Sequence, residues 1–177
     1  MPKFILGLIL GIIVVPVVVI LYIISGGAPA ATSDAPMPFE RWIARKALKT
    51  KIEKEMPKVV PLIANEATLL AGAQVYREDC AMCHGLPHRS APVVAPGMFP
   101  EPPQLFQPHD MVTDDPPGET FWKVKNGIRL TGMPGFVSSL SDVQMWQVSL
   151  LLAHGDKLSA PVQQALAAPA TATTPPK

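Results

Sequence analysis

Residues 4–24 form a continuous apolar run without a charged side chain, and 18 of these 21 residues are hydrophobic. At about 1.5 Å per residue, a helix of this length spans roughly 31 Å, the thickness of the hydrocarbon core of a bilayer. Pro16 lies within the run, and membrane helices tolerate a proline there. The sequence therefore predicts one transmembrane helix, and it leaves room for only one small soluble domain.

The apolar run has two interpretations. The first is a signal peptide that is removed, because residues 28–30 resemble a small-residue cleavage site. The run is longer than the roughly 7 to 15 apolar residues of such a signal, which favours an uncleaved signal anchor over residues 1–25. Lys3 precedes the run and the next basic residue is Arg41, so the positive-inside rule places the rest of the chain on the periplasmic side of a bacterial inner membrane.

The segment after the anchor divides into two parts. Residues 26–38 are rich in Gly, Ala, Pro and Ser, which indicates a flexible linker. Residues 39–60 read as a basic helical stalk, in which Leu48, Ile52 and Met56 form an apolar stripe that Trp42 joins loosely. Such a helix is either solvated, or lies on anionic lipid or on a partner subunit.

The remaining composition excludes several classes of protein. The formal net charge of +1 gives no sign of nucleic-acid binding, and two cysteines exclude a disulfide-rich scaffold. Residues 61–158 are expected to form the single folded domain. Residues 159–177 are rich in Ala, Pro and Thr, which predicts a disordered tail.

Both cysteines lie in a C-x-x-C-H motif formed by Cys80, Cys83 and His84. Two thiols at this spacing can add across the vinyl groups of a haem, while the histidine reaches the iron. The alternatives are a thioredoxin-type redox pair, half of a zinc site, or a disulfide. A thioredoxin pair needs a βαβ pattern, and zinc needs a second ligand pair, neither of which the sequence offers. The motif therefore favours one covalent haem c.

The residues before the motif add a resemblance. Gly72, Tyr76 and Cys80 follow each other at intervals of four in a helix predicted over residues 66–79. With the motif, this pattern resembles the N-terminal helix and haem-attachment site of class I monohaem cytochromes c, and the resemblance extends over residues 66–155. It implies an all-α fold, a small cytochrome c-like domain around one covalent haem, in which the first helix packs against the last.

The second axial ligand is expected downstream. Met133 lies between two glycines and a proline, in a loop that can approach a flat cofactor closely. Residues 126–134 resemble the family's N-G-x-x-x-x-G-M-P loop, which implies that Met133 is the sixth ligand of the haem iron, opposite His84. Met98 is the alternative, although we expect it to pack on the haem edge.

Other haem contacts are expected around this core. Residues 87–117 are rich in proline and resemble the family's haem-covering segment, in which a backbone carbonyl near Pro96 is expected to hold the Nδ1 proton of His84. Trp122, on a short helix, either fills the core or donates to a haem propionate. Arg129 either pairs with a propionate or is exposed to solvent.

The last predicted helix begins at a capping box at Ser141 and ends before Gly155. Val143, Trp146 and Leu150 are expected to face the first helix of the domain.

A haem with both axial positions filled has no open site for substrate, so the chemistry left to it is one-electron exchange. The sequence thus predicts an electron carrier rather than an enzyme, either a subunit of a larger complex or a mobile tethered carrier. Its partners are expected to be membrane-bound or periplasmic redox proteins and the lipid bilayer, with no nucleic acid and no small-molecule substrate. The alternative is a peroxidase-like haem enzyme with a displaceable sixth ligand. A sensor would need an output domain, for which there is no room.

Overall fold

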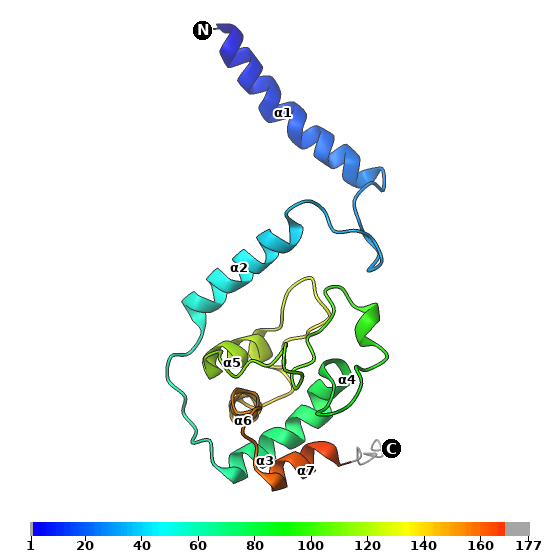
Figure 1. Ribbon diagram of the computed structural model, residues 1–177. Coiled ribbons are helices and arrows are strands. Elements are labelled where there is room, and N and C mark those ends of the chain that lie inside the picture. Colours follow the sequence, from blue (N-terminus) through cyan, green and yellow to red (C-terminus); the bar gives the residue numbers. More distant parts are fainter. Residues whose placement is uncertain (1, 169–177) are drawn as a thin grey trace. The chain divides into compact units, whose positions relative to one another are not determined.

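The computed structural model describes residues 2–168, and this part of the chain consists of helices and loops without a strand (Figure 1). The predicted all-α fold is confirmed. The α-helices are α1 (Pro2–Ile24), α2 (Glu40–Glu55), α3 (Glu66–Val75), α4 (Ala81–His84), α5 (Pro117–Asn126), α6 (Asp142–Ala153) and α7 (Ala160–Ala167). A π-helical turn, Tyr76–Cys80, joins α3 to α4, and a short 3-10 helix covers Ala95–Gly97. The chain forms two compact units that divide between Ala44 and Arg45.

Helix α1 contains the predicted apolar run. The segment Lys3–Ile24 is long and apolar enough to cross a membrane, on grounds of length and composition, and it remains helical through Pro16. A signal sequence near an N-terminus has the same properties. A single-pass anchor is therefore compatible with the helix and is taken up below as a proposal.

The linker after α1 is more structured than its composition suggested. The Asp34 carboxylate accepts hydrogen bonds from the backbone N–H groups of Ala30 and Ala31, at 2.8 and 2.9 Å, and Glu40 accepts one from Met37 at 2.8 Å. The two bonds to Asp34 lower the pKa of its carboxyl group. The predicted flexible linker thus contains turns, because acidic side chains satisfy nearby backbone donors.

Helix α2 lies within the predicted stalk, residues 39–60, and ends at Glu55. Ile52 is 2% exposed, and Leu48 and Met56 are half-buried, so the apolar stripe has a covered side. Trp42 does not join this stripe, since it is 67% exposed. Ten residues at about 100° each place Trp42 roughly a quarter turn around the helix from Ile52, so it lies beside the stripe rather than in it.

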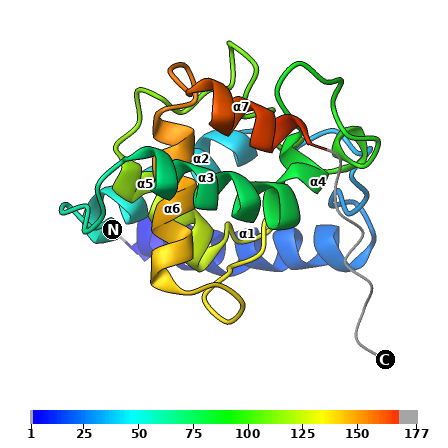
Figure 2. The same cartoon turned by 90° about the horizontal axis from the view of Figure 1, so that it is seen from below.

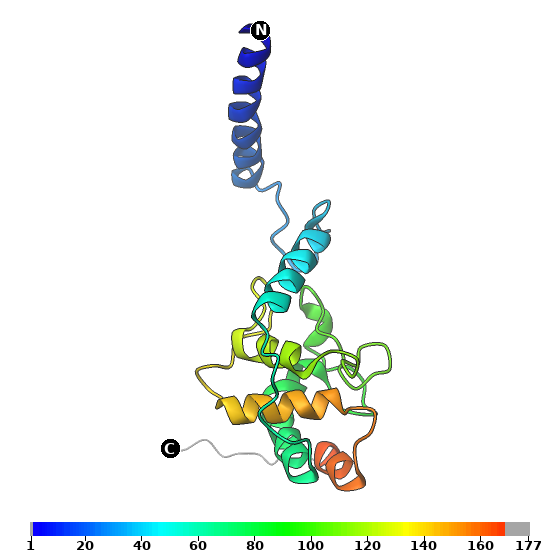
Figure 3. The same ribbon diagram turned by 90° about the vertical axis from the view of Figure 1, so that its left-hand side faces the viewer.

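In the second unit, α6 crosses α3, and α5 lies beside α6 (Figures 2 and 3). Gly72 lies where α3 and α6 meet. A Cβ atom there would lie 2.8 Å from the carbonyl carbon of Gln147 and 3.1 Å from the Cβ of Leu151. The absence of a side chain at Gly72 thus lets the two backbones approach, which confirms the expected packing of the first domain helix on α6.

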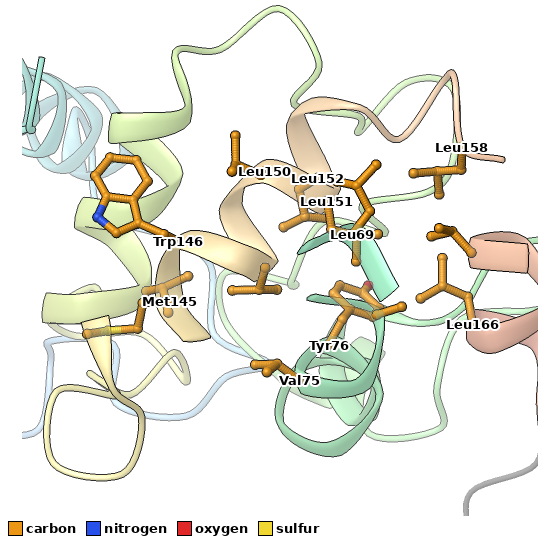
Figure 4. Packing of buried hydrophobic residues seen from close by; sticks show 14 of the residues in the cluster. Leu69, Val75, Tyr76, Met145, Trp146, Leu150, Leu151, Leu152, Leu158 and Leu166 are labelled. Carbon is orange, nitrogen blue, oxygen red and sulfur yellow. The ribbon is translucent and has the colours of Figure 1, made fainter. Parts of the chain in front are cut away.

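The hydrophobic core collects side chains from α3, α6 and α7 (Figure 4). On the other side of α6, Trp146 stacks on Phe121 of α5, with ring centroids 4.2 Å apart and planes at 18°. The prediction that Val143 and Trp146 face α3 is wrong: Val143 is 51% exposed, and Trp146 turns to α5. Helix α6 contacts helices on more than one side, so a single face of residues spaced three and four apart does not describe its contacts.

Both ends of α6 agree with the sequence. The Ser141 hydroxyl and the Gln144 side chain form the predicted reciprocal capping box. Helix α6 ends at Ala153, and His154 serves as its C-cap, with Nδ1 2.9 Å from the Leu150 carbonyl oxygen.

The expected tail from residue 159 onward is partly wrong. Helix α7 occupies Ala160–Ala167, and both Val162 and Leu166 are fully buried in the core cluster. These two apolar residues are four positions apart, so they share one face of the helix, and this face packs on α3. The domain therefore extends beyond residue 158, and residues 169–177 lie outside the described part of the chain.

Candidate functional site

The two cysteines lie where α3 continues through the π-helical turn into α4. Cys80 and Cys83 are half-buried and both are free thiols. Burial, with smaller contributions from Asp79 and Cys83, raises the pKa of the Cys80 thiol to about 12. A thioredoxin-type nucleophile needs the opposite, a lowered thiol pKa. The environment of Cys80 therefore does not support dithiol redox chemistry.

Tyr76 fixes the end of the motif to the helix that precedes it. Its fully buried hydroxyl donates to the carbonyl oxygen of Gly85 at 2.8 Å and lies 3.1 Å from that of His84. The ring meets Phe106 edge-on, with centroids 5.0 Å apart. Burial raises the pKa of Tyr76 well above its ordinary value, so the hydroxyl stays a donor. The predicted Gly72, Tyr76 and Cys80 pattern thus supports both the helix crossing and the motif.

His84 has one ring nitrogen committed to the proline-rich loop. Its Nδ1 lies 2.8 Å from the carbonyl oxygen of Pro103. Because a carbonyl oxygen only accepts, Nδ1 carries the proton, and Nε2 keeps a lone pair that can bind a metal. Burial lowers the pKa of His84, although the bond to Pro103 opposes this, so the neutral ring is favoured.

The prediction that His84 Nδ1 bonds to a backbone carbonyl near Pro96 is therefore wrong, because its partner is the carbonyl of Pro103. The loop is held at this point by Gln104, whose side-chain amide donates to the carbonyl of Cys83 at 3.1 Å. Gly85 has a left-handed φ of 70°, and the Gln104 side chain fills the position that a Cβ of Gly85 would take. Sequence reasoning missed Gln104, and its only signal was the resemblance of the surrounding segment to a haem-covering loop.

Met133 lies in a loop closed by its own hydrogen bonds. The Ile128 N–H donates to the Met133 carbonyl at 3.2 Å. The Thr131 hydroxyl donates to the Ile128 carbonyl at 2.7 Å and accepts from the Met133 N–H at 3.1 Å. The Met133 side chain is half-buried and packs against the core cluster. These bonds hold the thioether in a defined loop, a role for Thr131 that the sequence did not reveal.

Helix α5 supports this loop directly. The Phe136 N–H donates to the Val124 carbonyl at 2.9 Å, and Gly127, with φ at 68°, packs against the backbone of Gly135. Met98 approaches from the proline-rich loop, and its methyl group occupies the position that a Cβ of Gly132 would take. The Met133 loop thus brings together two segments that are distant in sequence.

Trp122 and Arg129 are the two other expected haem contacts, and their surroundings in the structure differ. The Trp122 indole donates to the Glu55 carboxylate at 3.3 Å, so the structure directs it to the end of α2 rather than into the buried core or toward a propionate. Glu55 comes from the stalk, whose path could not be read from the sequence. Arg129 is exposed, and its pairing with a propionate stays a prediction.

The donors at this site suit a covalently bound haem. Two half-buried thiols are three residues apart, an imidazole with its Nδ1 on a backbone carbonyl follows at once, and a half-buried thioether lies in a separate hydrogen-bonded loop. Over residues 2–168, no group of three or more His, Cys, Asp and Glu side chains is arranged to hold a metal ion. The zinc alternative therefore lacks a donor set in the described part of the chain.

The domain is similar to known haem proteins. Residues 67–150 match the family model described as cytochrome c oxidase, cbb3-type, subunit III. These residues thus form a cytochrome c-type domain, which implies haem c as the cofactor.

A chain of the reducing HAO-like protein complex of Kuenenia stuttgartiensis is similar in structure, with 26% sequence identity and a TM-score of 0.47. The similarity covers 56% of the present chain and 50% of that chain, so it spans half of the relative. No curated protein matches.

Proposed function

We propose that the protein is a membrane-anchored monohaem c-type cytochrome that carries single electrons between respiratory or dehydrogenase components on the periplasmic side of a bacterial inner membrane. The observation that carries this proposal is the hydrogen bond of His84, directly after the two cysteines, to the Pro103 carbonyl. With Nδ1 fixed on the Pro103 carbonyl, the ring presents an unprotonated Nε2 for coordination.

Each residue of the site has a defined part in this function. Cys80 and Cys83 would hold the cofactor through thioether bonds, and His84 and Met133 would bind its iron. Haem c, when bound, supplies a one-electron couple. With two iron ligands supplied by the protein, the chain would offer no position for oxygen or a substrate, and its task would be to set the reduction potential.

The cysteine edge of the site is open to partners. Met82, between the two cysteines, is 72% exposed, so this edge lies at the surface. A small apolar contact of this kind suits the brief encounters of redox proteins, which exchange electrons and separate quickly. The partners proposed here are membrane-bound or periplasmic redox proteins, and no small molecule is expected to bind.

The apolar helix α1 supports anchoring in the bilayer as a single span. An anchored carrier meets membrane-bound donors and acceptors at a higher effective concentration than a free one. The anchor and the basic stalk also suit a fixed subunit of a larger complex, which is the form that we favour. Co-purification of the chain with a redox complex separates this form from a mobile tethered carrier.

The test is an absorption spectrum of the purified full-length protein, oxidised and reduced, followed by extraction under denaturing conditions. Haem that stays with the chain, together with the weak far-red band of a sulfur ligand on ferric iron, is the expected result. Replacing both Cys80 and Cys83 by Ala should release the haem on extraction. Haem that is extracted from the unaltered chain contradicts covalent attachment, and ready binding of exogenous ligands contradicts an electron carrier with a fixed sixth ligand.

A further inference from the structure

The beginning of α2 exposes a compact group of large apolar side chains. Phe39, Trp42 and Ile43 are 75%, 67% and 57% exposed. Phe39 directly precedes α2 with a left-handed φ of 64°, and its carbonyl accepts from the Ile43 N–H at 2.9 Å, so it is held at the start of the helix. Within α2, Trp42 and Lys46 are four residues apart and Ile43 and Lys46 three, so these side chains share one side of the helix. We call these three residues, with Lys46 one turn further on, the outer face of α2.

Ile43, in the outer face, lies opposite the covered side of α2. Ile52 is 2% exposed, and nine residues at about 100° each place Ile43 half a turn around the helix from it. At the covered end, Glu55 bonds to Trp122, and the Pro57 carbonyl packs on Gly118 of α5. The outer face is therefore not needed to attach α2 to the domain.

Basic side chains accompany the outer face. Arg45, Lys46 and Lys49 lie within residues 39–49, where Glu40 is the single acidic residue. Arg45 and Lys46 are exposed, and Lys49 makes only a long surface ion pair of 3.9 Å with Glu53. Exposed tryptophan and phenylalanine side chains with flanking cations bind the headgroup region of a membrane. A helix surrounded only by water gains no stability from such aromatic residues.

The chain itself keeps the outer face near a membrane if α1 is the anchor. Fifteen residue steps separate Ile24 from Phe39, a reach of at most about 54 Å when fully extended at roughly 3.6 Å per step. The turns at Asp34 and Met37 shorten this reach. Even a weak affinity of the outer face for lipid is then sufficient, because the anchor holds this face near the bilayer at a high effective concentration.

We propose that the outer face of α2 docks on the surface of an anionic bilayer, with Phe39, Trp42 and Ile43 in the headgroup region and the basic side chains on lipid phosphates. This inference rests on the membrane anchor of the proposed function. Since the other end of α2 contacts α5, docking restricts the motion of the haem domain on its tether. The helix would then act as a second attachment point rather than as a plain spacer.

The experiment uses the full-length protein in vesicles of neutral lipid and in vesicles that contain anionic lipid, each with a nitroxide quencher at the headgroup. The difference in emission between the unaltered chain and a Trp42→Phe variant isolates the signal of Trp42. Flotation of the vesicles reports anchoring separately. We expect Trp42 to be quenched more strongly in anionic than in neutral vesicles, and high salt to remove the difference.

Charge variants test the electrostatic part. Lys46→Gln should lower the ratio of docked to undocked helix about fivefold, the factor that corresponds to roughly 1 kcal/mol for one basic residue at an anionic surface. Lys157→Gln is the control, because the side chain of this lysine is 78% exposed but follows α6, far from α2 in sequence. Equal effects of the two variants contradict a role for the outer face.

The outcomes separate the two proposals. A chain that floats with both kinds of vesicle while Trp42 remains unquenched overturns the docking and leaves the anchor intact. A chain that floats with neither overturns the anchor and the docking together, although its haem spectrum still tests electron transfer. Trp42 that is shielded from aqueous quenchers in native membranes, but not in vesicles, shows that the face binds a protein and overturns lipid docking.

Discussion

At the scale of single residues, the hydroxyl group of Tyr76 connects the helical segment before the C-x-x-C-H motif to Gly85, which follows the motif. We expect Tyr76→Phe to destabilise the domain by about 1–3 kcal/mol, because the buried carbonyl of Gly85 loses its donor. Tyr22→Phe, in the apolar helix α1, makes the same chemical change away from the core and should leave denaturant unfolding of the domain unaltered.

The raised pKa of Tyr76 leads to a prediction about the stability of the domain at alkaline pH. Burial raises the pKa of Tyr76, so ionisation is easier in the unfolded chain than in the folded one. The resulting stability is fully present below the unfolded pKa of about 10 and is lost as pH rises above it. Unfolding free energies measured up the alkaline range should fall less steeply in Tyr76→Phe. Equal slopes in the two proteins contradict the prediction.

The thioether of Met133 gives the second prediction at this scale. Met133→Ala should keep the haem attached, abolish the far-red sulfur band, and lower the reduction potential by on the order of 100 mV, a fraction of the roughly 0.8 V that axial ligands cover. Met98→Ala is the matched control, because Met98 contacts the same loop at Gly132. Loss of the band in Met98→Ala alone would make Met98 the ligand.

The sequence predicted the C-x-x-C-H motif and the helix before it better than it predicted the hydrogen-bond partners of the site residues. The intervals of Gly72 and Tyr76 follow from helical geometry, which is local. The choice of Pro103 over Pro96 depends on how a loop of irregular backbone returns to His84, and no periodicity describes such a path. For the same reason Gln104 and Thr131, which hold the two sides of the site, gave no signal of their own.

At the scale of helices, the crossing of α3 and α6 depends on a missing side chain. Gly72→Ala would favour an isolated helix by about 1 kcal/mol. In the folded domain its Cβ would lie 2.8 Å from the Gln147 carbonyl carbon, so the helices must separate. We expect a net loss of about 1–3 kcal/mol, measured by denaturant unfolding.

Gly97→Ala provides the comparison, because no atom lies within 4 Å of a Cβ at that position. Its effect should stay within about 0.5 kcal/mol. If both variants are equally stable, the crossing tolerates a methyl group and Gly72 is not required for it.

Helix ends and single helices were readable from the sequence, while their packing was less so. The capping box at Ser141 is a local signal and was found. Helix α7 was missed because its Ala and Pro content resembles that of a disordered segment. The pair Val162 and Leu166, four residues apart, was the available sign of a buried face, but a pair this short has meaning only with α3 opposite to it.

At the scale of the whole molecule, composition separated an apolar segment, which forms helix α1, from the rest of the chain, because a long apolar run and a mixed sequence suit different solvents. It placed the stalk outside the domain, whereas the end of α2 is attached to it through Glu55 and Pro57. Attachment of this kind joins segments that lie far apart in the chain, such as Glu55 and Trp122, and so leaves no trace in local sequence.

The attachment can be tested with two isoleucines of the same helix. Ile52 is 2% exposed and Ile43 is 57% exposed. In detergent without anionic lipid, Ile52→Ala should lower the free energy of unfolding of the haem domain by about 2–5 kcal/mol, because it leaves a cavity in a covered position. Ile43→Ala should change it by less than about 0.5 kcal/mol, since its side chain is already in solvent. Denaturant unfolding followed by the haem absorption measures both, and a domain indifferent to Ile52→Ala would mean that the stalk folds independently of the domain it carries.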